Sequence, residues 1–403
     1  MRIRLVALLF AGSVMWAQTA TWQDLVAAKK WAQAEPLLVA ADAATPDSVP
    51  VLEALAQTYR GLGRLRQADQ ILNRLVPLAP TVANVESAAR VKSGLGQWER
   101  AEQLFERVLE LRLDTDSTPV AAIPTRRQLA QVLVAEKKFG RAAQEALIAI
   151  SVRSRLLGND APDLAGDYAL LGRVYQAQEA WQEAARAWEE VVRVQTLAIG
   201  AEDLRVADSL LLLGECYGQY RRIPEGEAAL LKALAIRQVN LGAGHPDVGE
   251  ATDALGKLLY SAARYADAEV YFERSLEVYT SYLGAENALL ARNYDNLAVA
   301  EAASEKWDES AEHYREALKI RDADAAVNLH QLGMVEIARK DLAASEPFYV
   351  RAVELLEFPG NENPDLLKTM RTELEGIQQE TKKPQISKQA PRAKRPPVAA
   401  KQK

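Results

Sequence analysis

A fixed interval in the sequence constrains the fold more than any other feature. Segments of the form Leu-small-x-x-(Tyr or Leu) recur, and their small residues are Ala130, Gly172, Gly214, Gly256, Ala298 and Gly333. The first five are 42 residues apart, and the last follows after 35. A second series keeps the same 42-residue step in register with the first, at Gly158, Gly200, Gly242 and Gly284. Two series in register indicate a chain built from stacked repeats.

Each repeat has the pattern of two amphipathic helices. Apolar residues recur at intervals of three and four over residues 167–175, and again from Trp181 to about Ala198. We expect Gly172 and its equivalents where the paired helices cross, because a larger side chain would force the backbones apart. Aromatic residues make up only 6% of the chain, and Ala, Leu, Glu, Arg and Gln dominate. The sequence therefore predicts an all-α fold.

The pattern resembles the tetratricopeptide repeat (TPR), whose units have the order Leu, Gly, Tyr, Ala, large apolar residue, Ala and Pro. The unit that matches best has Leu171, Gly172, Tyr175, Ala184, Trp188 and Val191. We count eight units over most of residues 19–355. The resemblance implies a right-handed superhelical α-solenoid of stacked helix pairs, which binds its ligands along a concave groove.

Two types of unit are expected. Residues 18–113 carry units of about 33 to 34 residues, and residues 119–357 carry mostly 42-residue units. The extra residues lie in the loop between units, as in Leu-Gly-Ala-Gly-His-Pro-Asp at 241–247, where Gly ends one helix and Pro-Asp opens the next. This longer unit resembles the repeat of kinesin light chains over about residues 120–320. A helix over residues 364–380 is expected to cap the solenoid with a polar outer face.

The two ends of the chain differ from the repeats. Arg2 and Arg4 precede an apolar run of about twelve residues, which predicts a signal peptide over residues 1–17, cleaved after Ala17 or, alternatively, after Ala20. The other interpretation of this segment is an uncleaved anchor or a buried first helix. Residues 381–403 carry eight Lys or Arg, four Pro and no acid, which predicts a disordered basic tail. We therefore expect an exported protein, periplasmic or extracellular, with no transmembrane span in the mature chain.

The chemically reactive residues form no catalytic or metal-binding pattern. The single cysteine, Cys216, excludes an internal disulfide, and three histidines with one cysteine argue against a zinc or iron–sulfur site. We expect Cys216 to be buried in a first helix. His245 is expected to form an inter-repeat turn, His313 to be solvated and His330 to lie on the inner face. No carboxylate pair or phosphate-binding glycine loop stands out, so we expect no enzymatic activity, no cofactor and no metal.

The functional surface is expected on the concave side, which the first helix of every pair lines in such solenoids. Counted from the small residue, groove-facing positions lie six and three residues before it and one, four and five after it. Positive residues gather near Arg127 and Arg173, and acids between Asp208 and Asp253. Such a mixed groove suits an extended peptide or partner helix better than a polyanion. The expected partner-binding residues are Arg127, Gln131, Arg173, Gln176, Asp208, Glu215, Asp253, Lys257, Tyr260, Arg292, Asp295 and Asn296.

The leading hypothesis is an exported, non-enzymatic scaffold or adaptor that binds a protein or peptide in this groove. In TPR families, asparagines of the first helix often grip the ligand backbone; here Asn296 matches one of them, and Asp295 replaces the other. The Lys/Asn pattern that clamps a C-terminal carboxylate is absent. Residues 18–380 carry a net charge of −16, which argues against nucleic acid binding by the folded part. The alternative is an envelope-associated protein whose basic tail binds an anionic lipid, polysaccharide or nucleic acid, with the repeats as spacer, and a third interpretation is that the tail only keeps the protein soluble.

Overall fold

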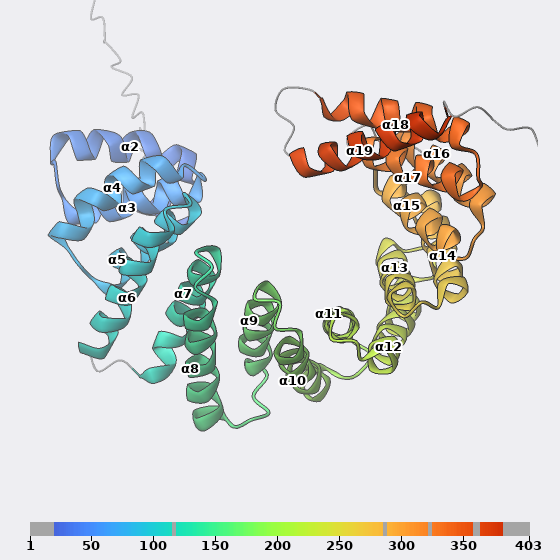
Figure 1. Cartoon of the computed structure of the whole chain (residues 1–403). Helices are drawn as coiled ribbons and strands as arrows, with labels where there is room; N and C mark the ends of the chain where they lie inside the picture. Colours follow the sequence, from blue (N-terminus) through green and yellow to red (C-terminus); the bar gives the residue numbers. More distant parts are fainter. Residues whose placement is uncertain (1–19, 115–117, 285–287, 321–324, 358–362, 382–403) are drawn as a thin grey trace, which may run out of the picture. The chain divides into compact units, whose positions relative to one another are not determined.

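The computed structural model describes residues 20–114, 118–284, 288–320, 325–357 and 363–381. The expected signal peptide and, except for Thr381, the expected basic tail lie outside the described residues. Over these ranges the chain forms α-helices joined by turns, with one 3-10 turn (Pro119–Ala122) and no strand (Figure 1). The helices are α1 (Trp22–Ala27), α2 (Trp31–Ala44), α3 (Val49–Gly61), α4 (Leu65–Leu78), α5 (Val82–Gly94), α6 (Trp98–Asp114), α7 (Ile123–Ala135), α8 (Phe139–Leu157), α9 (Leu164–Ala177), α10 (Trp181–Ile199), α11 (Leu204–Gln219), α12 (Ile223–Leu241), α13 (Pro246–Ser261), α14 (Tyr265–Leu283), α15 (Ala288–Ala303), α16 (Trp307–Ile320), α17 (Ala325–Ala338), α18 (Leu342–Leu356) and α19 (Pro364–Thr381).

Consecutive helices form antiparallel pairs, and neighbouring pairs pack against each other, as α4 on α5 and α14 on α15 show. The described residues contain nine such pairs, from α1–α2 to α17–α18, followed by α19. The expected all-α solenoid is confirmed, whereas the expected number of eight units is wrong. In the first pair, α2 carries the repeat residues Trp31, Ala34 and Leu38, whereas α1 has only six residues, too few to show a helical repeat of apolar positions.

The chain divides into two compact units, Met1–Ala198 and Ile199–Lys403. The first unit contains α1 to α10, and Leu52, Leu55 and Leu72 are among its fully buried residues. The second contains α11 to α19 and buries Val248 and Leu255 in the same way. Each unit therefore has its own apolar core between the layers of paired helices.

The small residue of each repeat lies where the two helices of a pair cross. A Cβ atom at Gly256 would lie 2.5 Å from the Phe272 ring, and one at Gly172 would lie 2.8 Å from Nε1 of Trp188. Both distances are shorter than van der Waals contact allows. The steric role expected for these glycines is confirmed: the large side chain of the second helix occupies the space that a Cβ would need.

The loops between the long repeats have the expected chemistry. Gly158 and Gly242 end α8 and α12 with φ of 86°, a conformation that glycine adopts without steric cost. His245 is the N-cap of α13, and its Nδ1 accepts a hydrogen bond from the backbone N–H of Asp247 at 3.2 Å. Pro246 follows at the first helical position. His245 therefore forms the turn, as expected.

The last helix, α19, packs on α18. Met370 is fully buried and Ile377 nearly so, whereas most other side chains of α19 are exposed or half-buried. This helix covers the segment expected to cap the solenoid, and it presents a polar outer face to water. No helix in the described part of the chain combines the length and the apolar character needed to cross a bilayer.

Candidate functional site

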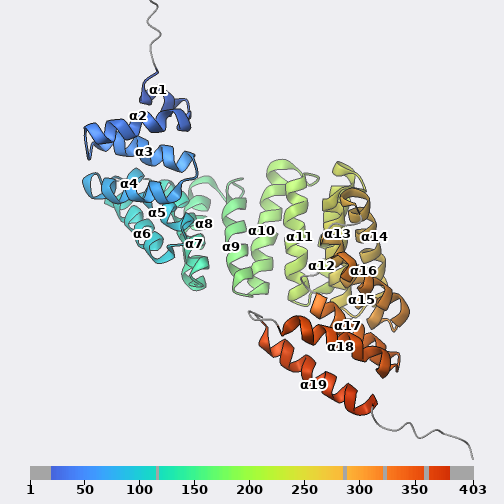
Figure 2. The ribbon, with the colours of Figure 1, turned by 90° about the horizontal axis from the view of Figure 1, so that it is seen from above.

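The first helices of successive pairs contact one another within each unit. In the first unit α7 contacts α5 and α9, and in the second unit α13 contacts α11 and α15 (Figure 2). A hydrogen bond from Arg60 on α3 to Ser87 on α5 shows that α3 also lies beside the first helices of the first unit. We call the surface of α3, α5, α7 and α9 the first-unit face, and the surface of α11, α13 and α15 the second-unit face. The expected groove residues lie on these two faces.

A buried arginine organises the acids of the second-unit face. Arg237 belongs to α12 and is only 4% exposed, yet its guanidinium lies 2.9 Å from Asp208 Oδ1 and 2.8 Å from Glu250 Oε2. It also donates a hydrogen bond to the carbonyl oxygen of Asp247 at 2.7 Å. The expected cluster of acidic residues is therefore present, but Arg237, which belongs to a second helix, partly neutralises its charge.

Asp253 is an internal residue of the second-unit face. Its side chain is 7% exposed, Oδ1 accepts a hydrogen bond from Asn296 Nδ2 at 2.8 Å, and Oδ2 lies 2.6 Å from Lys257 Nζ. Both carboxylate oxygens thus have partners within the protein. Asp253 and Asn296, expected to contact a ligand, instead join α13 to α15, while Lys257 remains half exposed to solvent.

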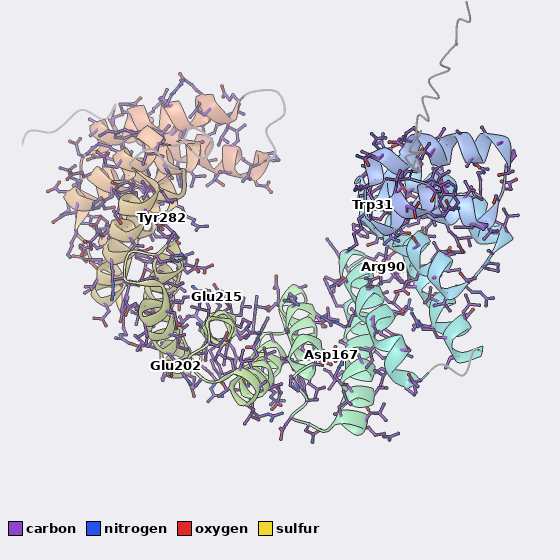
Figure 3. All side chains as sticks on the ribbon, turned by 180° about the vertical axis from the view of Figure 1, so that it is seen from behind. Trp31, Arg90, Asp167, Glu202, Glu215 and Tyr282 are labelled. Carbon is purple, nitrogen blue, oxygen red and sulfur yellow. The ribbon has the colours of Figure 1, made fainter. Side chains whose placement is uncertain are left out.

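Glu215 is the acid of this face that remains available. Its side chain on α11 is exposed and forms no ion pair with any residue that the structure describes (Figure 3). Partial desolvation raises its pKa, and the nearby charge of Glu250 adds to the effect, while Lys257 opposes it. Glu215 therefore gains from a cationic partner more than an isolated surface glutamate would.

Three further expected residues lie on the second-unit face with different exposures. Arg292 is exposed, whereas Tyr260 and Asp295 are half-buried. The Tyr260 ring lies 5.3 Å from the Tyr265 ring, centroid to centroid, and desolvation raises the pKa of Tyr260. Arg292 is thus the residue of the three that is best placed to contact a partner.

The first-unit face contains a buried ion pair that was not expected from the sequence. Asp167 on α9 is fully buried, and its Oδ2 accepts a hydrogen bond from Arg153 Nε at 2.6 Å. Arg127 on α7 approaches Oδ1 of the same carboxylate at 3.7 Å. Arg153 belongs to α8 and lies two 42-residue repeats before Arg237. The signal that could have found both is therefore an arginine at the same position of two second helices.

The remaining expected residues of the first-unit face also differ in role. Arg173 is exposed, and desolvation followed by repulsion from Arg127 lowers its pKa. Gln131 is exposed. Gln176 accepts a hydrogen bond from Trp188 Nε1 at 3.2 Å, so it satisfies the polar atom of a core side chain.

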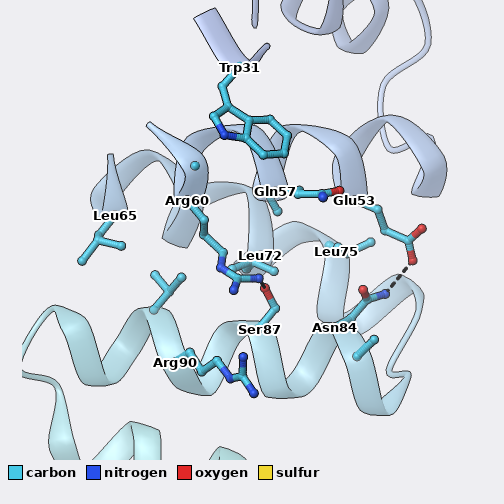
Figure 4. Close-up of a pocket in the computed structure, with 14 residues that line it drawn as sticks. Trp31, Glu53, Gln57, Arg60, Leu65, Leu72, Leu75, Asn84, Ser87 and Arg90 are labelled. Carbon is cyan, nitrogen blue, oxygen red and sulfur yellow. Dashed lines mark hydrogen bonds between the residues drawn. The ribbon is translucent and has the colours of Figure 1, made fainter. Parts of the chain in front are cut away.

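A groove of about 710 Å³ lies at the N-terminal end of the first-unit face (Figure 4). Its lining includes Trp31, Glu53, Gln57, Arg60 and Arg90. These residues are not among the partner-binding residues expected from the sequence. The same counting rule applied to Ala56 and Ala89 identifies Glu53, Gln57 and Arg60 on α3 and Arg90 on α5.

The structure changes the expectation for one histidine. His313, expected in solvent, is half-buried, stacks on Tyr294 with centroids 5.8 Å apart, and bonds through Nδ1 to Glu301 at 2.7 Å. His330 bonds through Nε2 to Glu373 of α19 at 2.6 Å. The described residues contain no group of three or more His, Cys, Asp or Glu side chains that could hold a metal ion, and Cys216 is buried.

Comparison with known proteins places these repeats in a family. Models of the tetratricopeptide repeat match residues 25–90, 88–118, 205–281 and 255–323, together more than half of the chain. The chain belongs to the tetratricopeptide repeat proteins. A curated relative, the Arabidopsis thaliana protein KINESIN LIGHT CHAIN-RELATED 3, is 26% identical over 199 residues, which are 49% of this chain and 30% of that relative. The chain therefore spans about a third of the relative's length, and its repeats are of the kinesin-light-chain-like type.

Solved structures agree on the fold. The C-terminal part of a TPR repeat-containing protein from Cytophaga hutchinsonii superposes with a TM-score of 0.51 at 13% identity, covering 64% of this chain and 93% of that one. The apo form of RapI superposes with a TM-score of 0.51 at 11% identity, covering 90% of this chain and 97% of that one. At these identities the similarity establishes a shared solenoid fold.

Proposed function

We propose that this protein is a non-enzymatic scaffold or adaptor that binds a protein or peptide partner through the faces of its first helices. The observation that carries the proposal is that some charged residues of the second-unit face are buried and paired within the protein, while others are exposed. Arg237 and Asp253 are buried and have internal partners, whereas Glu215, Lys257 and Arg292 project from the same face into solvent. Exposed charges held on a rigid support lose little conformational entropy when a partner binds.

The test is affinity capture with the full-length protein and charge-reversal variants. Glu215→Lys and Arg292→Glu change the second-unit face, and Arg173→Glu changes the first-unit face. Because these side chains are exposed, the variants should keep the unfolding temperature of the parent protein. We expect at least one of them to weaken binding of a partner recovered by the parent protein by about tenfold or more.

Matched controls come from the second helices. Arg186 on α10 and Lys232 on α12 are exposed, and Arg186→Glu and Lys232→Glu make comparable charge changes away from the two faces. Partner binding should survive both substitutions. The proposal fails if the control variants lose the partner as readily as the face variants, or if every face variant retains it fully.

We further propose that the protein is exported after removal of residues 1–17. The positive start and the short apolar run support this proposal. Mass spectrometry of the protein from fractionated cells tests it. A mature N-terminus at Gln18 in a periplasmic or culture fraction is expected, and an intact Met1 in the cytosolic fraction would contradict it.

A second candidate function rests on the charge of residues 381–403, which hold eight Lys or Arg and no acid. Such a segment would attach the protein to an anionic surface, with the repeats as spacer. Binding of the full-length protein to vesicles of anionic phospholipid should then fall steeply with salt and disappear on truncation after Glu380. Equal binding by the truncated protein would exclude this role.

A further inference from the structure

The groove at the N-terminal end of the first-unit face has opposite charges at its two ends. Glu53, Gln57 and Arg60 lie on one stripe of α3, at intervals of four and three residues, and all three are exposed. Seven residues of α-helix separate Glu53 from Arg60, which corresponds to about 10 Å along the axis. Figure 4 shows Glu53 toward one end of the groove and Arg60 with Arg90 toward the other.

The positive end is held in place by polar contacts. Arg60 Nη1 donates a hydrogen bond to Ser87 Oγ at 2.7 Å, and Arg90 Nε donates one to Gln128 Oε1 at 2.9 Å. Arg90 Nη2 also forms an ion pair with Glu86 Oε1 at 2.7 Å. Desolvation, followed by the charge of Arg90, lowers the pKa of Arg60. Arg60 forms no ion pair with a described residue, and Glu86 offsets its repulsion from Arg90 only in part. The two guanidinium groups therefore favour an incoming carboxylate, which can accept hydrogen bonds from both.

The negative end and the middle of the groove have different chemistry. Glu53 Oε1 accepts a hydrogen bond from Asn84 Nδ2 at 3.0 Å, and Asn84 is itself fixed by a second hydrogen bond to the carbonyl oxygen of Ala79. Glu53 thus keeps its other oxygen for a basic group. Between the two ends, the half-buried indole of Trp31 offers apolar surface, whereas Leu72 and Leu75 line the groove from within the core and are fully buried. An apolar side chain placed there would be removed from water.

We propose that this groove binds an extended peptide segment in which an acidic and a basic side chain lie about three residues apart, with an apolar side chain between them. The spacing follows from the separation of about 10 Å between Glu53 and Arg60 along α3. An extended chain of the polyproline II type advances by about 3.1 Å per residue and presents every third side chain on the same side. The acid contacts Arg60 and Arg90, the apolar residue contacts Trp31, and the base contacts Glu53. This inference rests on the proposed function as a peptide-binding scaffold, and it names the site and the ligand.

The experiment is a selection of random twelve-residue displayed peptides on the full-length protein, followed by affinity measurements with the enriched peptides in synthetic form. We expect enriched peptides to carry the paired charges with an apolar residue between them. Arg60→Glu and Arg90→Glu should each weaken their binding by about tenfold or more. Glu53→Lys should weaken peptide binding similarly. The same variant should bind tightly again to a peptide whose basic residue is replaced by Glu. That recovery would not follow from a merely structural role of Glu53.

Arg66→Glu is the matched control, because Arg66 is exposed on the second helix α4, and thermal unfolding of every variant checks its folding. Enriched peptides that bind Arg60→Glu and Glu53→Lys as tightly as the parent protein would overturn the inference. If the same peptides were lost with Glu215→Lys, the proposed function would stand and only the site would be wrong. The inference would also be overturned if the selection enriched acidic peptides whose binding is insensitive to Glu53→Lys, or if it enriched no peptide. Affinity capture of a partner would still test the proposed function separately.

Discussion

Asn296 on α15 donates a hydrogen bond from Nδ2 to Oδ1 of Asp253 on α13, at 2.8 Å. The two residues lie 43 positions apart and occupy neighbouring positions of successive repeats. Both were expected to face a ligand, and instead each satisfies the other. The bond joins two first helices, so these groove positions contribute to the support of the second-unit face rather than to its contact surface.

Replacing Asp253 should therefore lower stability. Asp253→Ala removes the acceptor for Asn296 and leaves Lys257 without its partner, so we expect a loss of about 1–3 kcal/mol in the free energy of unfolding. Urea unfolding followed by circular dichroism measures it. Glu215→Gln changes an exposed acid of the same face and should change stability by less than about 0.5 kcal/mol. Equal effects of the two substitutions would contradict the assignment of Asp253 to the support.

Arg153 should be essential for the stability of the first unit. Arg153→Met leaves the fully buried Asp167 carboxylate without its 2.6 Å partner, and the expected cost is about 3–5 kcal/mol. Arg193→Met breaks a solvent-exposed pair with Asp160 and should cost at most about 1 kcal/mol. A double-mutant cycle with Asp167→Asn measures the coupling. A coupling energy near zero would show that the buried pair contributes nothing specific.

Replacing the glycine at a helix crossing even by alanine should lower the stability of the protein. Gly256→Ala places a Cβ 2.5 Å from the Phe272 ring, and we expect a loss of about 1–3 kcal/mol although alanine favours helices. A Cβ at Gly140 on α8 would meet no neighbouring helix within 4 Å, so Gly140→Ala should instead stabilise the protein by about 0.5–1 kcal/mol. Thermal unfolding separates the two cases. Combining Gly256→Ala with Phe272→Leu should recover part of the loss, and no recovery would argue against a steric cause.

His313 should make stability depend on pH. The hydrogen bond to Glu301 raises the pKa of His313, and burial opposes this only in part. Because the pKa is higher in the folded protein, the stabilisation is fully present below the unfolded value of about 6.5 and is lost as pH rises through the folded value. The difference in unfolding free energy between the parent protein and His313→Gln should therefore decrease from about pH 5 to about pH 9. Glu301→Gln should flatten this dependence, and a difference that is constant with pH would refute the prediction.

Local pattern was sufficient to predict the helices and their turns. The positions of Gly172, Gly242 and His245 relative to the apolar residues identified the crossing point, the helix end and the N-cap. These features depend on residues a few positions apart, and a repeat presents the same local signal several times. In the first pair only α2 shows the pattern, at Trp31, Ala34 and Leu38, because the six residues of α1 are too few for any period to be visible.

The roles of individual groove residues could not be predicted in the same way. Counting positions correctly placed Glu215, Asp253 and Gln176 on first helices, but it could not distinguish an exposed acid from one with two internal partners. That difference depends on long side chains from other helices. Arg237, for example, reaches the acids of the second-unit face from the second helix α12.

The sequence by itself thus determined the helical repeat, the crossing glycines and the row of first helices, because spacing along one chain controls each of them. Only the tertiary structure decided which polar side chains support a face and which remain free to bind. Burial and ion pairing depend on contacts between helices, as the pairs Arg153–Asp167 and Asn296–Asp253 show. The oppositely charged ends of the groove at Glu53 and Arg60 became visible for the same reason: α2, α3, α4 and α5 form its walls together.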